Sequence, residues 1–320
     1  MNSLEAILKE AWKIRQATEP VLLVSAPGAK RYNNKYYINY EYSFMNLSVT
    51  GENCACHCEH CKGKLLETMV PTTTPEEMNR IIDRLAAKRS QGILISGGAN
   101  NKGEVPLLGF LDSMAYAKEK GLKVIVHSGL IKRSAALALK EVGIDQVLID
   151  IIGDERTIRN VYHLDRKPSD YLESMLFCRE VGLNLAPHVV IGLHFGDILG
   201  EYKALEMISE AQPQAVVMVI ITPTCGTGMQ GVIPPDIDEV GKVIGTARIL
   251  NPNIPLTLGC ARPTGEYKRQ VEIMAVDCGV NAIAYPDENT IEYASSKGLK
   301  TVFSQECCSL IGTGTGYNSK

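Results

Sequence analysis

Residues 92–129 read GILISGGANNKGEVPLLGFLDSMAYAKEKGLKVIVHSG, and their hydrophobic pattern decides the fold class. A short apolar run at 92–96 is followed by a helix-length amphipathic segment at 107–120 and a second β-branched run at 122–127. Short apolar runs bounded by glycine are typical of buried strands. A helix between two such runs is typical of a parallel β–α–β unit. The stretch therefore predicts parallel strands that are connected by helices.

The same alternation continues along the chain in both directions. Further strands are expected at 44–50, 146–151, 186–192, 215–222, 255–260 and 281–285, and helices near 75–90, 131–142, 168–182, 200–211, 236–250, 265–278 and 289–298. Eight strand–helix units predict an α/β fold, a parallel (β/α)8 TIM-type barrel, with a doubly wound open sheet as the alternative.

The two ends of the chain lack this alternation. We assign residues 1–43 to an N-terminal helix and a Tyr-rich cover segment, in which 18–43 is irregular. The barrel occupies 44–298, and a C-terminal tail with a cysteine pair occupies 299–320. The Gly/Thr-rich end of this tail is expected to be loose.

Composition and charge exclude several classes of protein. The chain has 320 residues, 45% of them hydrophobic, and a formal charge of −3, so no basic field points to nucleic acid. No apolar run is long enough to span a membrane, and the charged N-terminal helix is not a signal peptide, so a cytoplasmic location is expected. Disulfides are rare there, so clustered cysteines indicate metal ligands or catalytic thiols. Cys178 and Cys278 lie in predicted helices and are expected to be packing residues.

Four of the ten cysteines lie in the segment GENCACHCEHCKG, which follows the first strand of the predicted barrel. Active sites of such barrels lie at the carboxyl ends of the strands, so this loop lies where chemistry is expected. The spacing Cys54-x3-Cys58-x2-Cys61 offers three thiolates. A [4Fe–4S] cluster has four irons, so three thiolates leave one iron open to another ligand.

The alternative for this loop is a zinc site. Cys56, His57 and His60 could join the three cysteines as ligands. Structural zinc sites usually combine two separated knuckles, however, and the sequence has no second Cys-x2-Cys. The spacing therefore favours the cluster, with Cys56 as a bystander.

The cysteine loop, in its barrel context, resembles the signature of the radical S-adenosylmethionine (SAM) superfamily. The resemblance implies that SAM chelates the open iron and that His60, the residue before the last cysteine, lies near the adenine. One electron then cleaves SAM to methionine and a 5′-deoxyadenosyl radical, which removes a hydrogen atom from the substrate. The cofactor performs the difficult chemistry, while the protein orients the reactants and excludes water.

The motif ISGGAN at 95–100 ends the second predicted strand. Adjacent glycines let the backbone approach a ligand closely, although an ordinary strand–helix turn would look the same. Together with the cysteine loop, the motif resembles the superfamily's GGE-type sequence, which binds the methionyl amine of SAM. The resemblance makes Gly97, Gly98, Ala99 and Asn100 candidates for cofactor binding, with Ala99 in place of the acidic residue.

Polar residues at three further strand ends could face the same site. His127 and Ser128 follow the third strand, and Asp150, on the fourth, is a candidate for binding the ribose hydroxyls of SAM. His188 and His194 lie around the fifth strand. The alternative is that each is a satisfied polar group, with Asp150 paired to a Lys or Arg inside the barrel.

A second set of cysteines lies at the same face of the predicted barrel. Cys260 ends the seventh strand, and Cys307 and Cys308 lie in a tail that could fold over this face. We expect these three to hold a second [4Fe–4S] cluster, completed by Arg262, Cys225 or a small ligand. The alternative is a buried small hydrophobe at Cys260 and an unliganded pair in the tail.

Several stretches together resemble one family, the biotin-synthase-like proteins that form the split, two-protein, archaeal-type lipoyl synthase. They are VTGENCACHCEHCKG, LISGGANNKGEVPL, PHVVIGLHFGDILGE, ITPTCGTGM, LGCARPTGEYKRQVEIMA and QECCSL. The chain has no cysteine before Cys54, and so it does not resemble the single-chain lipoyl synthase outside the radical SAM loop.

The family resemblance implies sulfur insertion at C6 or C8 of an octanoyl chain, with the second cluster as sulfur donor. The implied partners are a lipoyl carrier (glycine-cleavage H protein or E2 lipoyl domain), a sister radical SAM protein and a ferredoxin- or flavodoxin-type electron donor. Two alternatives remain. One is another biotin-synthase-like reaction, a rearrangement or fragmentation of a small metabolite. The other is a non-enzymatic iron–sulfur or zinc protein.

Overall fold

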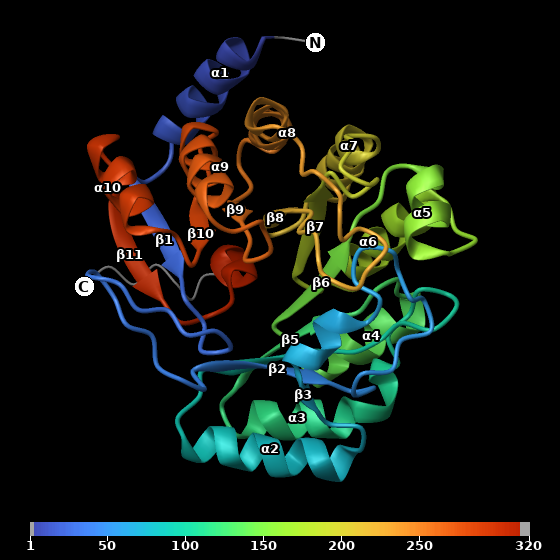
Figure 1. The fold of residues 1–320 in the computed structure, drawn as a ribbon. Helices are drawn as coiled ribbons and strands as arrows, with labels where there is room; N and C mark the ends of the chain where they lie inside the picture. The colour runs from blue at the N-terminus through green and yellow to red at the C-terminus, as the bar shows by residue number, and fades with distance from the viewer. Residues whose placement is uncertain (1–2, 314–320) are drawn as a thin grey trace.

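The described residues, 3–313 of this computed structural model, form one all-parallel sheet with the strand order β11-β1-β10-β9-β8-β7-β6-β5-β4-β2-β3 (Figure 1). The strands are β1 Val21–Ser25, β2 Phe44–Ser48, β3 Val70–Pro71, β4 Gly92–Ser96, β5 Lys123–His127, β6 Gln146–Asp150, β7 Leu185–Ile191, β8 Val216–Ile220, β9 Leu256–Leu258, β10 Ala282–Ala284 and β11 Lys300–Ser304.

Helices surround the outer face of the curled sheet (Figure 1). They are α1 Leu4–Gln16, α2 Pro75–Ala87, α3 Leu111–Glu119, α4 Arg133–Val142, α5 Glu155–Tyr162, α6 Pro168–Glu180, α7 Glu201–Ala211, α8 Ile237–Leu250, α9 Glu266–Asp277 and α10 Glu288–Ser296, with the 3-10 turns η1 Lys64–Thr68, η2 Leu107–Phe110 and η3 Cys308–Gly312. No helix of the described chain is both long enough and apolar enough to cross a bilayer.

The predicted α/β class with a parallel, barrel-type sheet is confirmed, but the sheet is a curled half-barrel and not a closed ring. Its strand order ends at β11 and β3, which are not paired with each other in the part of the chain that the structure describes. β3 has only two residues, and the second of them, Pro71, has no N–H to donate to a further strand. The sheet therefore ends at β3.

All eight predicted strands are present within two residues of the expected ends, but the sheet also enters the segments on either side of 44–298. Val21–Ser25 lies in the segment predicted to be irregular, yet it pairs with both β10 and β11. β11 lies in the predicted tail. The boundaries 1–43 and 299–320 are thus corrected, because both ends of the chain supply strands. The sequence also missed helix α5.

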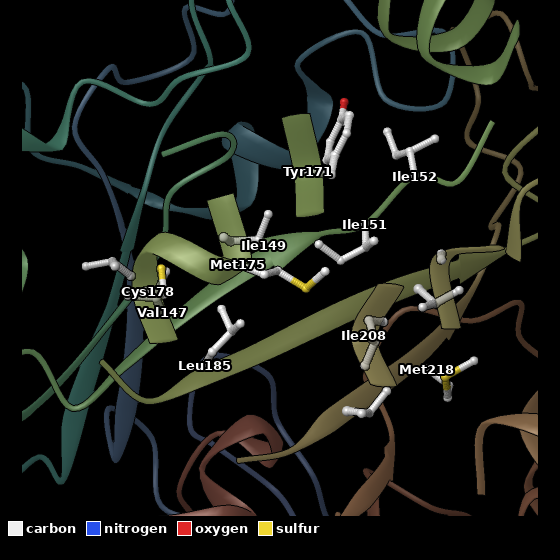
Figure 2. Close-up of a cluster of buried hydrophobic side chains, with 14 of the residues drawn as sticks. Val147, Ile149, Ile151, Ile152, Tyr171, Met175, Cys178, Leu185, Ile208 and Met218 are labelled. Atoms are coloured by element: carbon white, nitrogen blue, oxygen red, sulfur yellow. The ribbon is translucent and has the colours of Figure 1, made fainter. Parts of the chain in front are cut away.

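A hydrophobic layer joins the outer face of the sheet to its helices (Figure 2). Ile149 on β6 and Leu185 on β7 pack toward Met175 and Cys178 of α6, and all four are buried. Cys178 and Cys278 have no exposed surface, as expected for packing residues. Burial of this kind contributes about 25 cal/mol per Å² of apolar surface and holds the strand ends in place.

The C-terminal segment fills the inside of the curl and does not lie across its opening. Leu310 and Ile311 of η3 pack in a buried cluster with Ala282 and Ala284, whose short side chains leave room for the turn. The Ser25 hydroxyl donates to the Glu306 carbonyl (2.6 Å), and the Thr257 hydroxyl donates to the Cys308 carbonyl (3.3 Å). Lys123 of β5 forms an ion pair with Glu306. The Gly/Thr-rich end that was expected to be loose, 314–320, lies outside the described residues.

We predict that Lys123→Met destabilises the protein by about 1–3 kcal/mol, because it removes the cation that pairs with the partly buried Glu306 carboxylate. Urea unfolding of the protein would measure the loss. The control is Lys13→Met, which breaks an exposed pair with Glu10 and should change nothing measurable. Equal stability of the Lys123 variant and the wild type would show that the ion pair does not hold the tail.

Candidate active site at the open end of the half-barrel

Backbone pairing between β2 and β4 continues beyond the strands and positions the cysteine loop. The Val49 N–H donates to the Ser96 carbonyl (2.8 Å), and the Ala55 N–H donates to the Ala99 carbonyl (3.0 Å). Between them, the Gly98 N–H donates to the Thr50 hydroxyl (2.7 Å). The loop after β2 is therefore bound along its length to the turn after β4.

The second glycine of the ISGGAN motif is required by this contact. A Cβ atom on Gly98 would lie 1.9 Å from the Asn53 carbonyl oxygen and 2.5 Å from the Cys54 Cα. Real Cβ atoms do not approach backbone so closely, so any other residue here would displace the loop. The close approach inferred from the glycine pair is therefore made to the cysteine loop itself.

The four clustered thiols, Cys54, Cys56, Cys58 and Cys61, lie close enough for each to perturb the pKa of the next. Hydrogen bonds from neighbouring thiols lower the pKa of Cys56 and of Cys61, while the pKa values of Cys54 and Cys58 are raised. Thiols this close cannot all ionise without a compensating cation. The donor set is therefore suited to a bound metal centre.

Two of the three motif cysteines form a compact donor set with His60. Ligand atoms of Cys58, His60 and Cys61 lie within 4.8 Å of one another, and no other set of three in residues 3–313 meets that criterion. Cys54, the third motif cysteine, lines the same cavity but lies outside this set. His57 is exposed, so it does not join a zinc set.

A cavity of about 230 Å³ opens beside these thiols at the carboxyl ends of the strands. It is lined by six of the eight predicted cofactor-binding residues, namely His60, Gly97, Gly98, Ala99, His127 and Asp150. The other two, Asn100 and Ser128, line a neighbouring cavity of about 350 Å³ that also contains Glu104 and Lys132.

Several known proteins are related to the chain in sequence, although no family model matches it. A biotin synthase of Prochlorococcus marinus subsp. pastoris is 25% identical over 250 residues, which cover 76% of this chain and 73% of that protein. A second biotin synthase, from P. marinus strain MIT 9312, is 23% identical over 304 residues. The match covers 90% of this chain and 88% of that protein.

Solved structures show the same fold. Methylornithine synthase superposes with a TM-score of 0.61 at 16% identity, over 94% of this chain and 91% of that one. The FeFe-hydrogenase maturase HydG from Carboxydothermus hydrogenoformans superposes with a TM-score of 0.63 at 14% identity, over 95% of this chain and 73% of that one. The chain is therefore distantly related in sequence to biotin synthases and has the partial-barrel fold of radical SAM enzymes. A [4Fe–4S] cluster and SAM are the typical cofactors of such enzymes.

Charged and polar groups also gather at this cavity. His127 Nε2 lies 3.4 Å from Asp150 Oδ1, and the His127 ring stacks on His188 with 5.4 Å between centroids. Burial opposes ionisation of Asp150, but His127 outweighs it and lowers the pKa of Asp150 to about 2. Burial, and then His127, lower the pKa of His188 to about 4. Asp150 thus pairs with a histidine and not with a Lys or Arg.

The second set of cysteines lies inside the same end of the half-barrel. Burial, and then charges on Cys260, Cys307 and Cys308, raise the pKa of Tyr285, so all three thiols lie near one phenol. Burial and the nearby Cys307 also raise the pKa of Cys260, although part of that residue is exposed to solvent. The three sulfurs do not lie within 4.8 Å of one another.

Arg262, one of the residues expected to complete this second set, is already bonded. It is buried and donates to the Glu272 carboxylate (2.5 Å) and to the carbonyl of Gly259 (2.5 Å). Its predicted role as a ligand is therefore corrected. Cys225, the other candidate, is exposed.

Sequence reasoning missed two tyrosines that line the cavity, Tyr162 and Tyr171. Tyr162 ends the unpredicted helix α5, and Tyr171 lies on α6 (Figure 2). His194 lies outside this cavity, where its Nδ1 is 3.1 Å from the Thr157 hydroxyl. The one sequence signal for Tyr162 is its position in the VYHLD segment, which follows the fourth predicted strand and so lies near the carboxyl ends of the strands.

We predict that Gly98→Ala weakens binding of the radical SAM cluster roughly tenfold or more, because the new methyl group displaces the backbone at Cys54. Iron retained per chain after gel filtration of the reconstituted protein would measure this. In the matched control Gly109→Ala, no atom lies within 4 Å of the added carbon, so full iron content is expected. Full iron in the Gly98 variant would contradict the packing argument.

Proposed function

We propose that this protein is a radical SAM enzyme, and that it inserts sulfur at C6 or C8 of an octanoyl chain carried by a lipoyl carrier protein. In this proposal, Cys260, Cys307 and Cys308 hold a second [4Fe–4S] cluster that donates the sulfur. The observation that supports it most is the position of η3 inside the half-barrel, which brings the two tail cysteines toward Cys260.

The contacts of the tail support a common site for these cysteines. Cys307 lies close enough to His127, a residue of the first cavity, for each to influence the pKa of the other. Hydrogen bonding from Cys308, opposed by burial, lowers the pKa of Cys307 to about 7. A thiol that ionises near neutral pH is a good metal ligand. Both cysteine sets would then border one substrate space.

Spacing within the second set does not match a single-ion site. The three sulfurs do not all lie within 4.8 Å of one another, so they do not form a ready site for one zinc ion. Arg262 would act on this site indirectly. Through its bonds to Gly259 and Glu272, it fixes the strand end that carries Cys260.

The residues around the first cavity suit an alkyl substrate. Bound SAM and its cluster would supply hydrogen-atom abstraction, which reaches unactivated methylenes. Apolar side chains exclude water from this space, and they are Leu65, Leu66, Met69, Leu94, Val105, Leu130 and Leu164. Leu65 remains 59% exposed and stands where a chain on a carrier protein could enter.

The proposal requires partners that present the substrate and supply electrons. The carrier would be glycine-cleavage H protein or an E2 lipoyl domain, and a sister radical SAM protein would perform the other insertion. A ferredoxin or flavodoxin would reduce the cluster. All of these belong to the proposal.

A second candidate function is another biotin-synthase-like reaction, a rearrangement or fragmentation without sulfur insertion. It is favoured by the local bonding of the tail cysteines. Cys307 Sγ accepts a hydrogen bond from the Ser309 hydroxyl (3.3 Å), and the Cys308 carbonyl accepts one from Thr257. In this alternative the second set has a packing role only.

Iron and sulfide counts after anaerobic reconstitution separate the two candidates. For sulfur insertion we predict about eight irons per chain in the wild type and about four in the Cys54→Ala/Cys58→Ala/Cys61→Ala variant. The complementary Cys260→Ala/Cys307→Ala/Cys308→Ala variant should also hold about four and should still cleave SAM.

A single cysteine variant controls for non-specific loss. Cys225→Ser removes an exposed thiol outside both sets, so it should retain the wild-type iron content. A wild-type count of about four that falls to none in the first triple variant would rule out the second cluster and favour the reaction without sulfur.

A further inference from the structure

Two buried polar atoms beside the cavity have no hydrogen-bond partner, the hydroxyl of Tyr162 and Nδ1 of His60. Both residues line the cavity. Buried polar groups in proteins are nearly always paired, and an unpaired group at a site often marks the place of a ligand. These two atoms therefore point to an occupant with polar edge atoms.

The position of Tyr162 is fixed by both of its neighbours in sequence. The Val161 carbonyl accepts a hydrogen bond from the Glu59 N–H (2.8 Å), and His163 Nε2 lies 3.0 Å from the Glu59 carboxylate. Glu59 belongs to the cysteine loop and immediately precedes His60. The end of α5 is therefore attached to that loop, with Tyr162 held between the two contacts.

The two rings face one another across a short distance. Their centroids are 5.2 Å apart and their planes are inclined by 39°. Two aromatic surfaces that each carry one unpaired polar atom match a flat aromatic ligand with donors and acceptors on its edge. The purine of SAM has this chemistry. Its methionine part is charged and chelating, and needs a metal or charged partners instead.

We propose that the Tyr162 hydroxyl binds the purine end of SAM, next to His60, and thereby orients the nucleoside in the cavity. This inference rests on the radical SAM part of the proposed function and is independent of sulfur insertion. Tyr162 is a cofactor-binding residue that sequence reasoning did not identify.

A second unpaired tyrosine provides a matched control. The hydroxyl of Tyr202, on α7, is also buried without a partner, but Tyr202 does not line the cavity. Removing an unpaired buried hydroxyl relieves its desolvation, so Tyr162→Phe and Tyr202→Phe should both unfold at the wild-type urea midpoint or above it. A binding defect confined to Tyr162→Phe could then not come from misfolding.

Equilibrium dialysis of the anaerobically reconstituted protein against SAM, 5′-deoxyadenosine and methionine tests the inference. In Tyr162→Phe we expect the affinities for SAM and 5′-deoxyadenosine to fall about fivefold to tenfold, by the loss of one hydrogen bond. Methionine binding and iron content should not change. In Tyr202→Phe the affinities for SAM, 5′-deoxyadenosine and methionine, and the iron content, should all match the wild type.

Two results would overturn the inference. Unchanged SAM affinity in Tyr162→Phe would show that the hydroxyl does not bind SAM, and an equal loss of methionine affinity would place it at the wrong end of the cofactor. Both leave the radical SAM assignment intact. A wild-type protein that holds its cluster but binds neither SAM nor 5′-deoxyadenosine would overturn that assignment together with the inference.

Discussion

The close approach of Gly98 to the backbone at Cys54 is the constraint on which the candidate site depends. β2 and β4 are neighbours in the sheet, with Ser48 opposite Ser96, and the turns that follow them remain in contact. A glycine is needed where the two turns meet, because a Cβ atom would overlap the loop backbone. One sheet pairing and one missing side chain thus position the three motif thiols beside the cavity.

A parallel sheet brings every strand's carboxyl end to the same edge, and this protein uses that edge from two sides. The loop after β2 carries the first cysteine set, while the segments after β9 and β11 carry the second. The second approach depends on β1, because it pairs with β11 and its Ser25 also bonds the backbone at Glu306. Both ends of the chain therefore contribute to the inside of the half-barrel (Figure 1).

The hydrophobic pattern along the chain predicted the strands and helices that have a clear local signal. Eight strands and eight of their helices follow from short apolar runs and amphipathic segments. The first of these helices, α2, begins at a capping box of Thr74 and Glu77. β1 was missed because it is a five-residue run beside an irregular Tyr-rich segment, and its place depends on distant strands. α5 was missed because it has only eight residues, fewer than the amphipathic segments that predicted the other helices.

The same holds for the candidate site, in which contiguous motifs were predictable and contacts between distant segments were not. Cysteine spacing and the glycine pair identified the loop and its neighbour, since both are contiguous motifs. The entry of the segment around Glu306 into the half-barrel was not predictable, because its anchors, Lys123 among them, are distant in sequence. The unpaired hydroxyl of Tyr162 likewise becomes visible only when α5 is placed against the cysteine loop.

Reductive cleavage of SAM by the reconstituted protein tests the central claim most directly. With dithionite under anaerobic conditions, the wild type should convert SAM to 5′-deoxyadenosine and methionine in equal amounts, and Cys58→Ser should form neither. That result would establish that the loop on β2 carries a SAM-cleaving cluster. A wild-type protein that retains its iron, binds SAM and yet forms no 5′-deoxyadenosine would contradict the account.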